Sequence, residues 1–176
     1  MEAILSATAH ILRREGAGRL STNRIALKAG VSIGSLYQYF RDKDAIVAEL
    51  RRRFDAEFQD RFVASFLKAG PLPLRAAVAE FVRALVVLHA EDPGLHNAVS
   101  SGLTEEQRPR LEQIVASYLE AHRRELRRKD LVLAAAVTLD VAEALVHGVS
   151  VRAPERLQDE AFVAEVTDVL TRYLVR

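Results

Sequence analysis

Side chains that can contact nucleic acid are concentrated in one short stretch, from Ser21 to Lys43. The amide of Gln38 can pair with N6 and N7 of an adenine, and Ile33 can touch a thymine methyl group. Asn23 can reach a base edge or a phosphate. A tyrosine hydroxyl, or a lysine at a helix N-terminus, suits a phosphate oxygen. This stretch can therefore bind DNA if the chain holds these side chains on one surface.

The same stretch contains the signals of two helices joined by a tight turn. The hydroxyl of Ser21 can accept a hydrogen bond from a free backbone N–H in the first turn of a helix. Gly30 ends that helix, because glycine adopts a positive φ without strain, and Ser32 can cap the next helix. Two helices joined by three or four residues that include a glycine are the helix-turn-helix motif, whose second helix enters the DNA major groove.

Other kinds of site have weaker support. The five histidines form no HExxH pattern and the chain has no cysteine, so we expect no metal site, no cofactor and no thiolate chemistry. Asp140, Glu143 and His147 share one helix face. This spacing allows a metal or proton-linked role, but a polar stripe that faces solvent or a pocket mouth is the favoured interpretation. The chain contains no nucleophile elbow, phosphate loop or catalytic carboxylate pair, so we expect no enzyme.

Composition indicates a folded helical protein of the cytoplasm. The chain has 176 residues, of which 49% are hydrophobic. The longest apolar run, from Leu131 to Val151, is interrupted by two carboxylates and a histidine, so we expect no membrane segment. The absence of cysteine fits a reducing compartment.

Charge divides the chain unevenly, although its formal net charge is only +1. Residues 1–53 carry ten Lys and Arg against five Asp and Glu, and the remainder carries fifteen against nineteen. A basic first third suggests that only this part meets a polyanion. Charge alone is equally compatible with two ordinary solvated surfaces. The helix-turn-helix motif is therefore needed to choose between these two interpretations.

Hydrophobic periodicity predicts helices throughout and no strand. We expect a three-helix DNA-binding domain over 1–45 and a helical-bundle domain over 46–176, and the family resemblance described below implies that this second domain serves ligand binding and dimerisation. The row Phe54, Phe58, Phe62 and Phe66 lies on one long helix from Lys43 that can link the two. The predicted helices cover residues 2–15, 21–29, 32–39, 43–66, 74–90, 95–101, 110–129, 131–151 and 159–175.

The last two helices have more apolar surface than one buried face requires. Leu131 to Val151 is apolar around most of its circumference, and Asp159 to Val175 carries two apolar rows. Small residues such as Ala134, Ala142 and Gly148 would let helices approach closely. We predict a homodimer interface of four-helix-bundle form, because a helix-turn-helix protein generally reads a two-fold site with two copies. The alternative is that both helices lie inside one larger monomer core.

The N-terminal stretch resembles the signature of the TetR family of bacterial transcriptional regulators. The resemblance rests on Asn23-Arg24-Ile25-Ala26, Ala29-Gly30-Val31-Ser32, Gly34-Ser35-Leu36-Tyr37-Gln38-Tyr39-Phe40 and Lys43. It implies a ligand-responsive regulator, most simply a repressor that a small hydrophobic or amphipathic effector releases from a double-stranded DNA operator. The family often has a basic arm before the first helix. Here the chain begins within that helix, so either the arm is absent or the true start lies upstream.

The resemblance also assigns residues to roles. Tyr37, Tyr39 and Lys43 resemble the phosphate-clamping residues of the family, although a half-buried packing role for either tyrosine would be as plausible on its own. The predicted DNA-contact set is Ser21, Thr22, Asn23, Ser32, Ile33, Gly34, Ser35, Tyr37, Gln38, Tyr39 and Lys43. The predicted ligand-contact set, on helices that enclose the pocket in this family, is Phe81, Leu85, His89, His96, Tyr118 and His122. A constitutive DNA-binding or architectural protein without an effector remains the main alternative.

Overall fold

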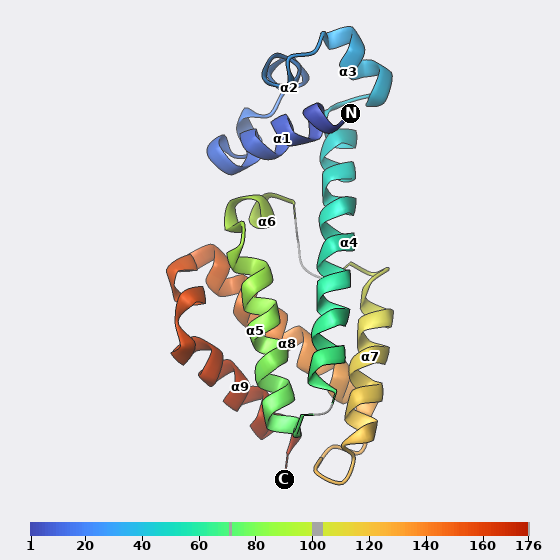
Figure 1. Ribbon diagram of the computed structural model, residues 1–176, viewed down its shortest axis with the longest axis vertical. Coiled ribbons are helices and arrows are strands. Elements are labelled where there is room, and N and C mark those ends of the chain that lie inside the picture. Colours follow the sequence, from blue (N-terminus) through green and yellow to red (C-terminus); the bar gives the residue numbers. More distant parts are fainter. Residues whose placement is uncertain (71, 100–103, 176) are drawn as a thin grey trace. The chain divides into compact units, whose positions relative to one another are not determined.

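The computed structural model describes residues 1–70, 72–99 and 104–175, apart from the side chain of Phe66. The described residues form helices, and their only strand-like pairing is an isolated bridge between Leu126 and Val175. Figure 1 shows the order of the elements. They are α1 (Glu2–Glu15), η1 (Ala17–Arg19), α2 (Thr22–Ala29), α3 (Ile33–Tyr39), α4 (Lys43–Ala69), α5 (Leu74–Ala90), α6 (Pro93–Val99), α7 (Arg108–Ala121), α8 (Leu131–Arg152), η2 (Pro154–Gln158) and α9 (Glu160–Leu174). The predicted all-α fold class is confirmed.

The chain packs as two compact units. The first unit comprises Met1–Glu57 and Gly94–Ser100, and the second comprises Phe58–Pro93 and Ser101–Arg176. The single helix α4 contributes its first part to one unit and its second part to the other. The predicted functional boundary at residue 45 stays a prediction, because packing and function need not divide a chain at the same residue.

The core of the first unit is built by α1, α2, α3, the start of α4 and α6. Ile4, Ile11, Ile25, Leu36 and Ile46 are almost wholly buried there. The three N-terminal helices are too short to enclose a large core on their own. Leu95 and Val99 of α6, which come much later in the sequence, complete the core.

The second unit is a helical bundle around a larger apolar core. Helix α5 packs against α8 and α9, and α7 packs against α8. Phe62, Val82, Leu111, Ala135 and Leu170 are buried in this core. Of the aromatic row predicted on α4, Phe54 packs in the first unit and Phe58 and Phe62 in the second, whereas the side chain of Phe66 lies outside the described residues.

Helix α7 ends eight residues before the predicted end at Lys129. His122 leaves the helix at φ −106°, and the segment after it runs through turns to Leu126, which pairs with Val175. The side chains of Arg127 and Arg128 both donate to the carbonyl of Tyr173 near the end of α9. This tertiary pairing satisfies carbonyls that the end of α9 leaves free, and it overrides the helical pattern of the sequence.

Helix α6 covers Pro93–Val99 and so begins two residues before its predicted start. The last two residues of the predicted segment, 100 and 101, lie outside the described residues. Proline fits the first helical turn because its missing N–H has no partner there in any case.

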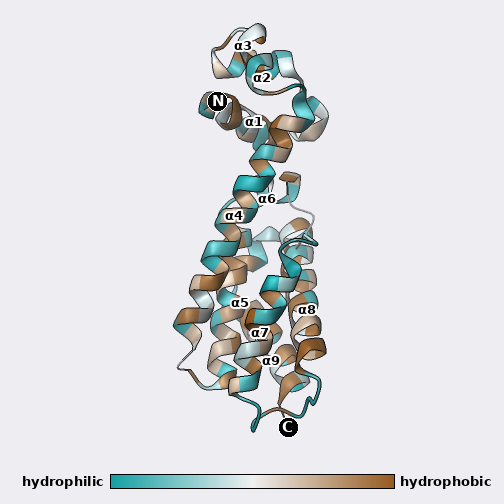
Figure 2. Cartoon of the chain, turned by 90° about the vertical axis from the view of Figure 1, so that its right-hand side faces the viewer, coloured by the Kyte–Doolittle hydropathy of each residue, from teal (hydrophilic) through white to brown (hydrophobic). Residues whose placement is uncertain are grey.

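Helix α8 covers the apolar run that we expected not to form a membrane segment. By length and composition alone it could cross a membrane, and 33% of its apolar window is buried. Core helices of helical domains pass the same test. Leu131, Leu139 and Val146 lie in the core of the second unit, and brown, hydrophobic positions recur along α8 in Figure 2. Its partly buried state fits a core helix with one further apolar face.

The two closing helices divide their apolar residues between the core and the surface. Ala134 and Ala142 are buried in the unit's own core, so they allow close packing within one chain rather than with a second chain. On α9, the row with Val163 and Leu170 is buried, whereas Val169 of the other row is 47% exposed. Val166 of that second row is also buried in the core, and Phe162 and Tyr173 pack against it, so the monomer core leaves only part of the second predicted face exposed.

Candidate functional site

Helices α2 and α3 form a helix-turn-helix that has the predicted serine caps and the predicted glycine turn. The hydroxyl of Ser21 accepts from the backbone N–H of Arg24, and that of Ser32 accepts from Ser35 at 3.0 Å. Gly30 adopts φ 68° and ψ 29°, the left-handed conformation that lets the chain reverse after α2. The hydroxyls of Ser21 and Ser32 therefore cap the two helices of the motif.

Helix α3 presents its polar and aromatic side chains to solvent. Leu36 is fully buried and Phe40 is nearly so, and both anchor the helix to the core. Tyr37 and Tyr39 are 52% and 58% exposed. Both tyrosine rings are therefore about half exposed, which fits a phosphate contact and half-buried packing alike, and their role as DNA contacts stays a prediction. Of the remaining predicted DNA contacts, Ser21, Thr22 and Ser35 are partly buried, and Asn23, Ser32, Ile33, Gly34, Gln38 and Lys43 are exposed.

Hydroxyl groups on the exposed side of the helix-turn-helix contact one another. The hydroxyls of Thr22 and Tyr37 lie 3.3 Å apart, which joins the start of α2 to α3. The hydroxyls of Ser32 and Ser35 lie 2.9 Å apart. These contacts reduce the number of rotamers open to side chains that would meet a phosphate, and such ordering lowers the entropy lost on binding.

Arg41, two residues before α4, is a second exposed cation beside Lys43 that the predicted DNA-contact set does not contain. Asp42 caps α4 by accepting from the N–H of Ala45 at 2.7 Å, and Lys43 is exposed at the first helical position. The neighbouring Arg41 pairs with Asp42 at 3.1 Å, yet its side chain remains 88% exposed. The Tyr39-Phe40-Arg41-Asp42-Lys43 run could have suggested Arg41 as a further phosphate contact.

Ion pairs connect the helices of the first unit. Arg24 of α2 pairs with Glu15 of α1, and Arg53 of α4 donates to both Glu2 and Glu49. Hydrogen bonds from Arg52 and then Arg53 lower the pKa of Glu49 to about 2. The Arg53 contacts tie α1 to α4 behind the helix-turn-helix.

The predicted ligand residues do not form one group. Phe81 and Tyr118 line the same apolar cavity of the second unit, together with Ala69, Leu74, Ala77, Val78, Val115, Leu119, Thr138 and Leu174. His122 stacks on Tyr118 with ring centroids 4.5 Å apart. Leu85 is buried in the core of the second unit. His96 belongs to the first unit, where its ring packs edge-on against Phe54 at 5.1 Å.

The cavity is small in this conformation. Its volume of about 20 Å³ has room for about one water molecule. Ligand pockets for drug-sized molecules commonly measure about 300–1,000 Å³. Burial raises the pKa of Tyr118, and the charge of Glu125 adds to this rise. The Tyr118 hydroxyl donates to the carbonyl of Leu72 at 3.3 Å, and Thr138 is the other polar side chain among the lining residues.

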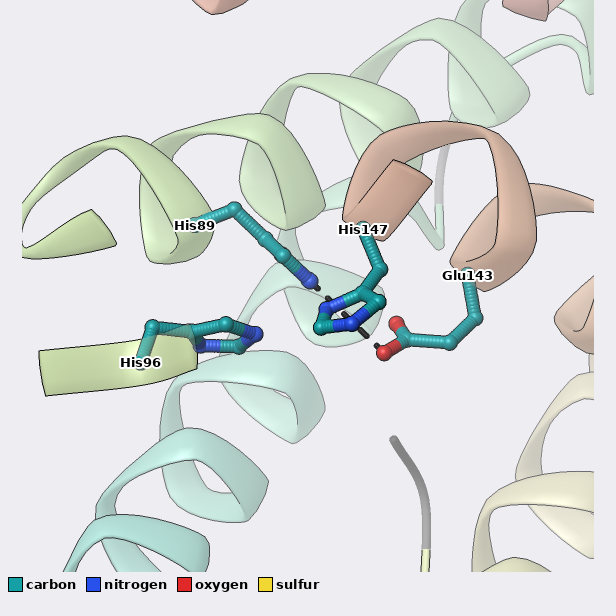
Figure 3. A group of neighbouring side chains, drawn as sticks. All are labelled: His89, His96, Glu143 and His147. Atoms are coloured by element: carbon teal, nitrogen blue, oxygen red, sulfur yellow. Dashed lines mark ion pairs between the residues drawn. The ribbon is translucent and has the colours of Figure 1, made fainter. Parts of the chain in front are cut away.

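The remaining predicted ligand residue, His89, faces α8 instead of the cavity. Its Nε2 lies 3.6 Å from Oε1 of Glu143, and its ring centroid lies 6.0 Å from that of His147 (Figure 3). Asp140, predicted on the same stripe, is exposed and pairs with Arg108 of α7 at 2.6 Å. The predicted polar stripe therefore divides: Asp140 faces solvent, whereas Glu143 and His147 turn toward α5.

The fold and the exposed motif define a helix-turn-helix protein with a separate helical-bundle unit. A family model described as bacterial regulatory proteins of the tetR family matches residues 4–50, and one described as a tetracyclin repressor-like C-terminal domain matches residues 73–174. The chain belongs to the TetR family of bacterial transcriptional regulators, which are DNA-binding proteins and not enzymes.

Individual relatives agree with this assignment. An uncharacterized HTH-type transcriptional regulator of Haemophilus influenzae is 33% identical over 70 residues, covering 40% of this chain and 37% of that protein. The matched region thus spans little more than a third of that relative. A TetR-family transcriptional regulator from Streptomyces coelicolor superposes with a TM-score of 0.70 at 28% identity, over 98% of this chain and 95% of the other. The SmeT–triclosan complex has a similar fold, with a TM-score of 0.68 at 18% identity over 99% and 91% of the two chains.

Proposed function

We propose that this regulator is a homodimeric repressor that binds a two-fold DNA operator and leaves it when a small hydrophobic or amphipathic effector binds. The observation that carries the proposal is the division of α3, with Leu36 buried and Tyr37, Gln38 and Tyr39 exposed. This division leaves the side chains suited to bases and phosphates accessible on a helix that the core holds firmly. A protein that binds DNA for this purpose works in the bacterial cytoplasm.

The proposed switch acts through α4, because this helix belongs to both units. An effector that shifts α4 changes the separation of the two recognition helices in the dimer. That separation must match about 34 Å, one turn of DNA, or a multiple of it. Effector binding and operator binding are then coupled, and each weakens the other by the same factor.

The lining of the cavity supports an apolar effector. Phe81, Val115 and Leu174 contribute aliphatic and aromatic surface, and Tyr118 contributes one hydroxyl group. The related fold of SmeT holds triclosan, which is a small aromatic molecule. Because the cavity has a volume of only about 20 Å³, an effector there must widen it, and this movement is the proposed signal to α4.

The same small volume is the one observation that favours a second candidate function, a DNA-binding regulator without an effector. The two candidates differ in what they bind. A ligand that binds only the native state raises the melting temperature. Heating the protein with a panel of apolar and cationic small molecules therefore separates a ligand-responsive regulator from a constitutive one.

The operator test begins with DNA recovered with the protein and sequenced, together with the region upstream of its own gene. We expect a two-fold symmetric site that the protein binds more tightly than random duplex by about 10³-fold or more. An effector from the thermal panel should then weaken binding to this site. Equal affinity for all duplexes would overturn the regulator proposal, and an operator that no stabilising compound affects would favour the constitutive candidate.

A further inference from the structure

Three metal-ligand side chains of the second unit converge between two of its helices. His89 lies on α5, and Glu143 and His147 lie one turn apart on α8, as Figure 3 shows. Ligand atoms of these three residues all lie within 4.8 Å of one another. His96, which Figure 3 also draws, belongs to the first unit, and the three groups of the second unit are sufficient for a site with an open position.

The hydrogen bond of His89 leaves the lone pair of its Nε2 able to bind a cation. Its Nδ1 lies 2.9 Å from the carbonyl oxygen of Leu85. A carbonyl can only accept, so Nδ1 carries the hydrogen. In the neutral ring, Nε2 then has its lone pair directed toward Glu143, with Oε1 3.6 Å away. Metal-bound histidines commonly have this arrangement, in which the other ring nitrogen donates to a backbone carbonyl.

Burial increases the need for a positive charge between these groups. His89 is fully buried, and the ring of Phe58 packs edge-on against it at 6.2 Å. The side chain of Glu143 is only 16% exposed, and its buried Oε2 makes no hydrogen bond within the described part of the chain. A carboxylate held this far from water is costly unless a positive charge faces it, and the imidazole of His89 supplies that charge only when it is protonated. The partial exposure of Glu143 and His147 leaves an approach from solvent.

We propose that the second unit binds one divalent transition-metal ion, of the Zn²⁺ class, through His89 Nε2, a ring nitrogen of His147 and the Glu143 carboxylate. Two imidazoles and one carboxylate suit zinc, nickel, copper or iron better than magnesium or calcium, which prefer oxygen ligands. Zinc with bonds of about 2.0–2.1 Å in tetrahedral geometry places its ligand atoms roughly 3.4 Å apart. His89 and Glu143 are already close to this separation, and the other pairs reach it by small side-chain movements. The fourth position is left for water or a donor atom of a small molecule.

An ion at this site would fix α5 to α8 near the end of α5. His89 precedes Pro93, the first residue of α6, by only four positions, and α6 supplies Leu95 and Val99 to the core of the first unit. A metal-dependent effect on operator binding therefore rests on the proposed function. Metal binding itself does not, because all three ligands belong to the second unit.

The test uses the full-length, untagged protein after metal removal, titrated with Zn²⁺ by calorimetry and with Co²⁺ by visible absorption. We expect one ion per chain and the intense visible bands of four-coordinate cobalt. Loss of a group that hydrogen-bonds to a metal ligand typically weakens metal affinity by about 10–100-fold, and loss of a ligand itself should cost at least as much. His147→Ala and Glu143→Gln should therefore each weaken binding by about 10–100-fold or more.

Two matched variants act as controls. Asp140→Asn removes a carboxylate one turn before Glu143, where the side chain pairs with Arg108, and His122→Gln removes a histidine that stacks on Tyr118. Both should bind Zn²⁺ as the wild type does. Absence of stoichiometric binding by the folded wild type, or an equal loss in a control and a ligand variant, would overturn the site. Operator binding with and without Zn²⁺ is measured separately, so that failure of the regulator proposal leaves the titration result intact.

Discussion

At the level of single residues, Tyr39 and Lys43, two of the predicted phosphate contacts, are exposed. Replacing either one by alanine would remove a proposed phosphate contact, and a phosphate contact carries no base information. We expect Lys43→Ala to weaken binding to the operator and to mutated operators about equally, and to reduce the slope of log affinity against log salt by about one. Tyr39→Ala should lower affinity in the same uniform way.

Fluorescence anisotropy at several salt concentrations measures this effect. Lys129→Ala, which removes an exposed lysine of the second unit, is the matched control and should leave the salt slope unchanged. A slope for Lys43→Ala equal to that of the wild type would remove Lys43 from the set of phosphate contacts.

Gln38 is predicted to read a base, so its substitution should have a different signature. An amide that pairs with an adenine edge contributes about 1–3 kcal/mol of discrimination against the wrong base. Gln38→Ala should therefore relax the preference at one operator position while the other positions keep theirs. Binding to a set of single-base operator variants measures this. A uniform loss at every position would reassign Gln38 to the DNA backbone.

The acid stability of the first unit should depend on Glu49. Hydrogen bonds from Arg52 and Arg53 lower the pKa of this carboxyl from its usual value of 4.5 to about 2. Because the folded state favours the ionised carboxylate, the stabilisation is present above about pH 4.5 and is lost as the pH falls toward about 2. Glu49→Gln lacks this ionisation and should lower the melting temperature at neutral pH.

The difference between the wild type and Glu49→Gln should shrink steadily as the pH falls through that range. Circular dichroism melts at a series of pH values measure it, and Glu105→Gln controls for the loss of an exposed charge in the other unit. A difference that does not change with pH would show that the arginine contacts of Glu49 do not stabilise the fold.

At the level of elements, local signals predicted the helix-turn-helix well because each signal acts within a few residues. Ser21, Gly30 and Ser32 do what their types predict, since a cap or a left-handed turn needs no distant partner. The predicted end of α7 was wrong because contacts with residues far away in the sequence determine where this helix ends. Arg127 and Arg128 donate to Tyr173, which lies about a quarter of the chain away, and no local pattern reports such a pairing.

The turn between α2 and α3 should depend on the conformation of Gly30. A Cβ at this residue would meet no atom within 4 Å, so the cost of Gly30→Ala comes from the backbone at φ 68°. A left-handed conformation costs a non-glycine residue roughly 1–2 kcal/mol. We expect Gly30→Ala to destabilise the protein by about that amount in urea unfolding.

Gly18→Ala is the matched control for this turn. Gly18 is also surrounded by open space, but its φ is not positive. Its substitution should be neutral or slightly stabilising, because alanine restricts the unfolded chain. If both variants destabilised the protein equally, the left-handed backbone conformation of Gly30 would not be the reason why this position needs glycine.

At the level of the whole molecule, the candidate sites differ in how far the sequence reveals them. The predicted DNA-contact residues lie within 23 consecutive positions, so spacing and capping could place them together. The cavity collects residues from Ala69 to Leu174, and His89 meets Glu143 across 54 positions. Only the packing of the bundle brings these residues together, and for this reason the sequence could assign the family but not an effector.

Exposed apolar side chains on α8 and α9 allow a test of the predicted dimer interface. Val132 and Leu133 on α8 are 66% and 59% exposed, and Val169 on α9 is 47% exposed. A homodimer with four-helix-bundle packing through these two helices would bury such side chains. We expect Leu133→Arg combined with Val169→Arg to convert the protein to a monomer at micromolar concentration in analytical ultracentrifugation.

The reason for this expectation is that two copies would each have to bury two arginines in the same apolar interface, and such unpaired buried charges are strongly unfavourable. Leu67→Arg is the matched control, because Leu67 is 78% exposed on α4, outside these two helices. This variant should sediment as the wild type does. The monomer should also lose operator affinity far more than it loses thermal stability, since the helix-turn-helix stays folded while the two half-sites are no longer read together. A double variant that remains dimeric would place the interface elsewhere on the chain.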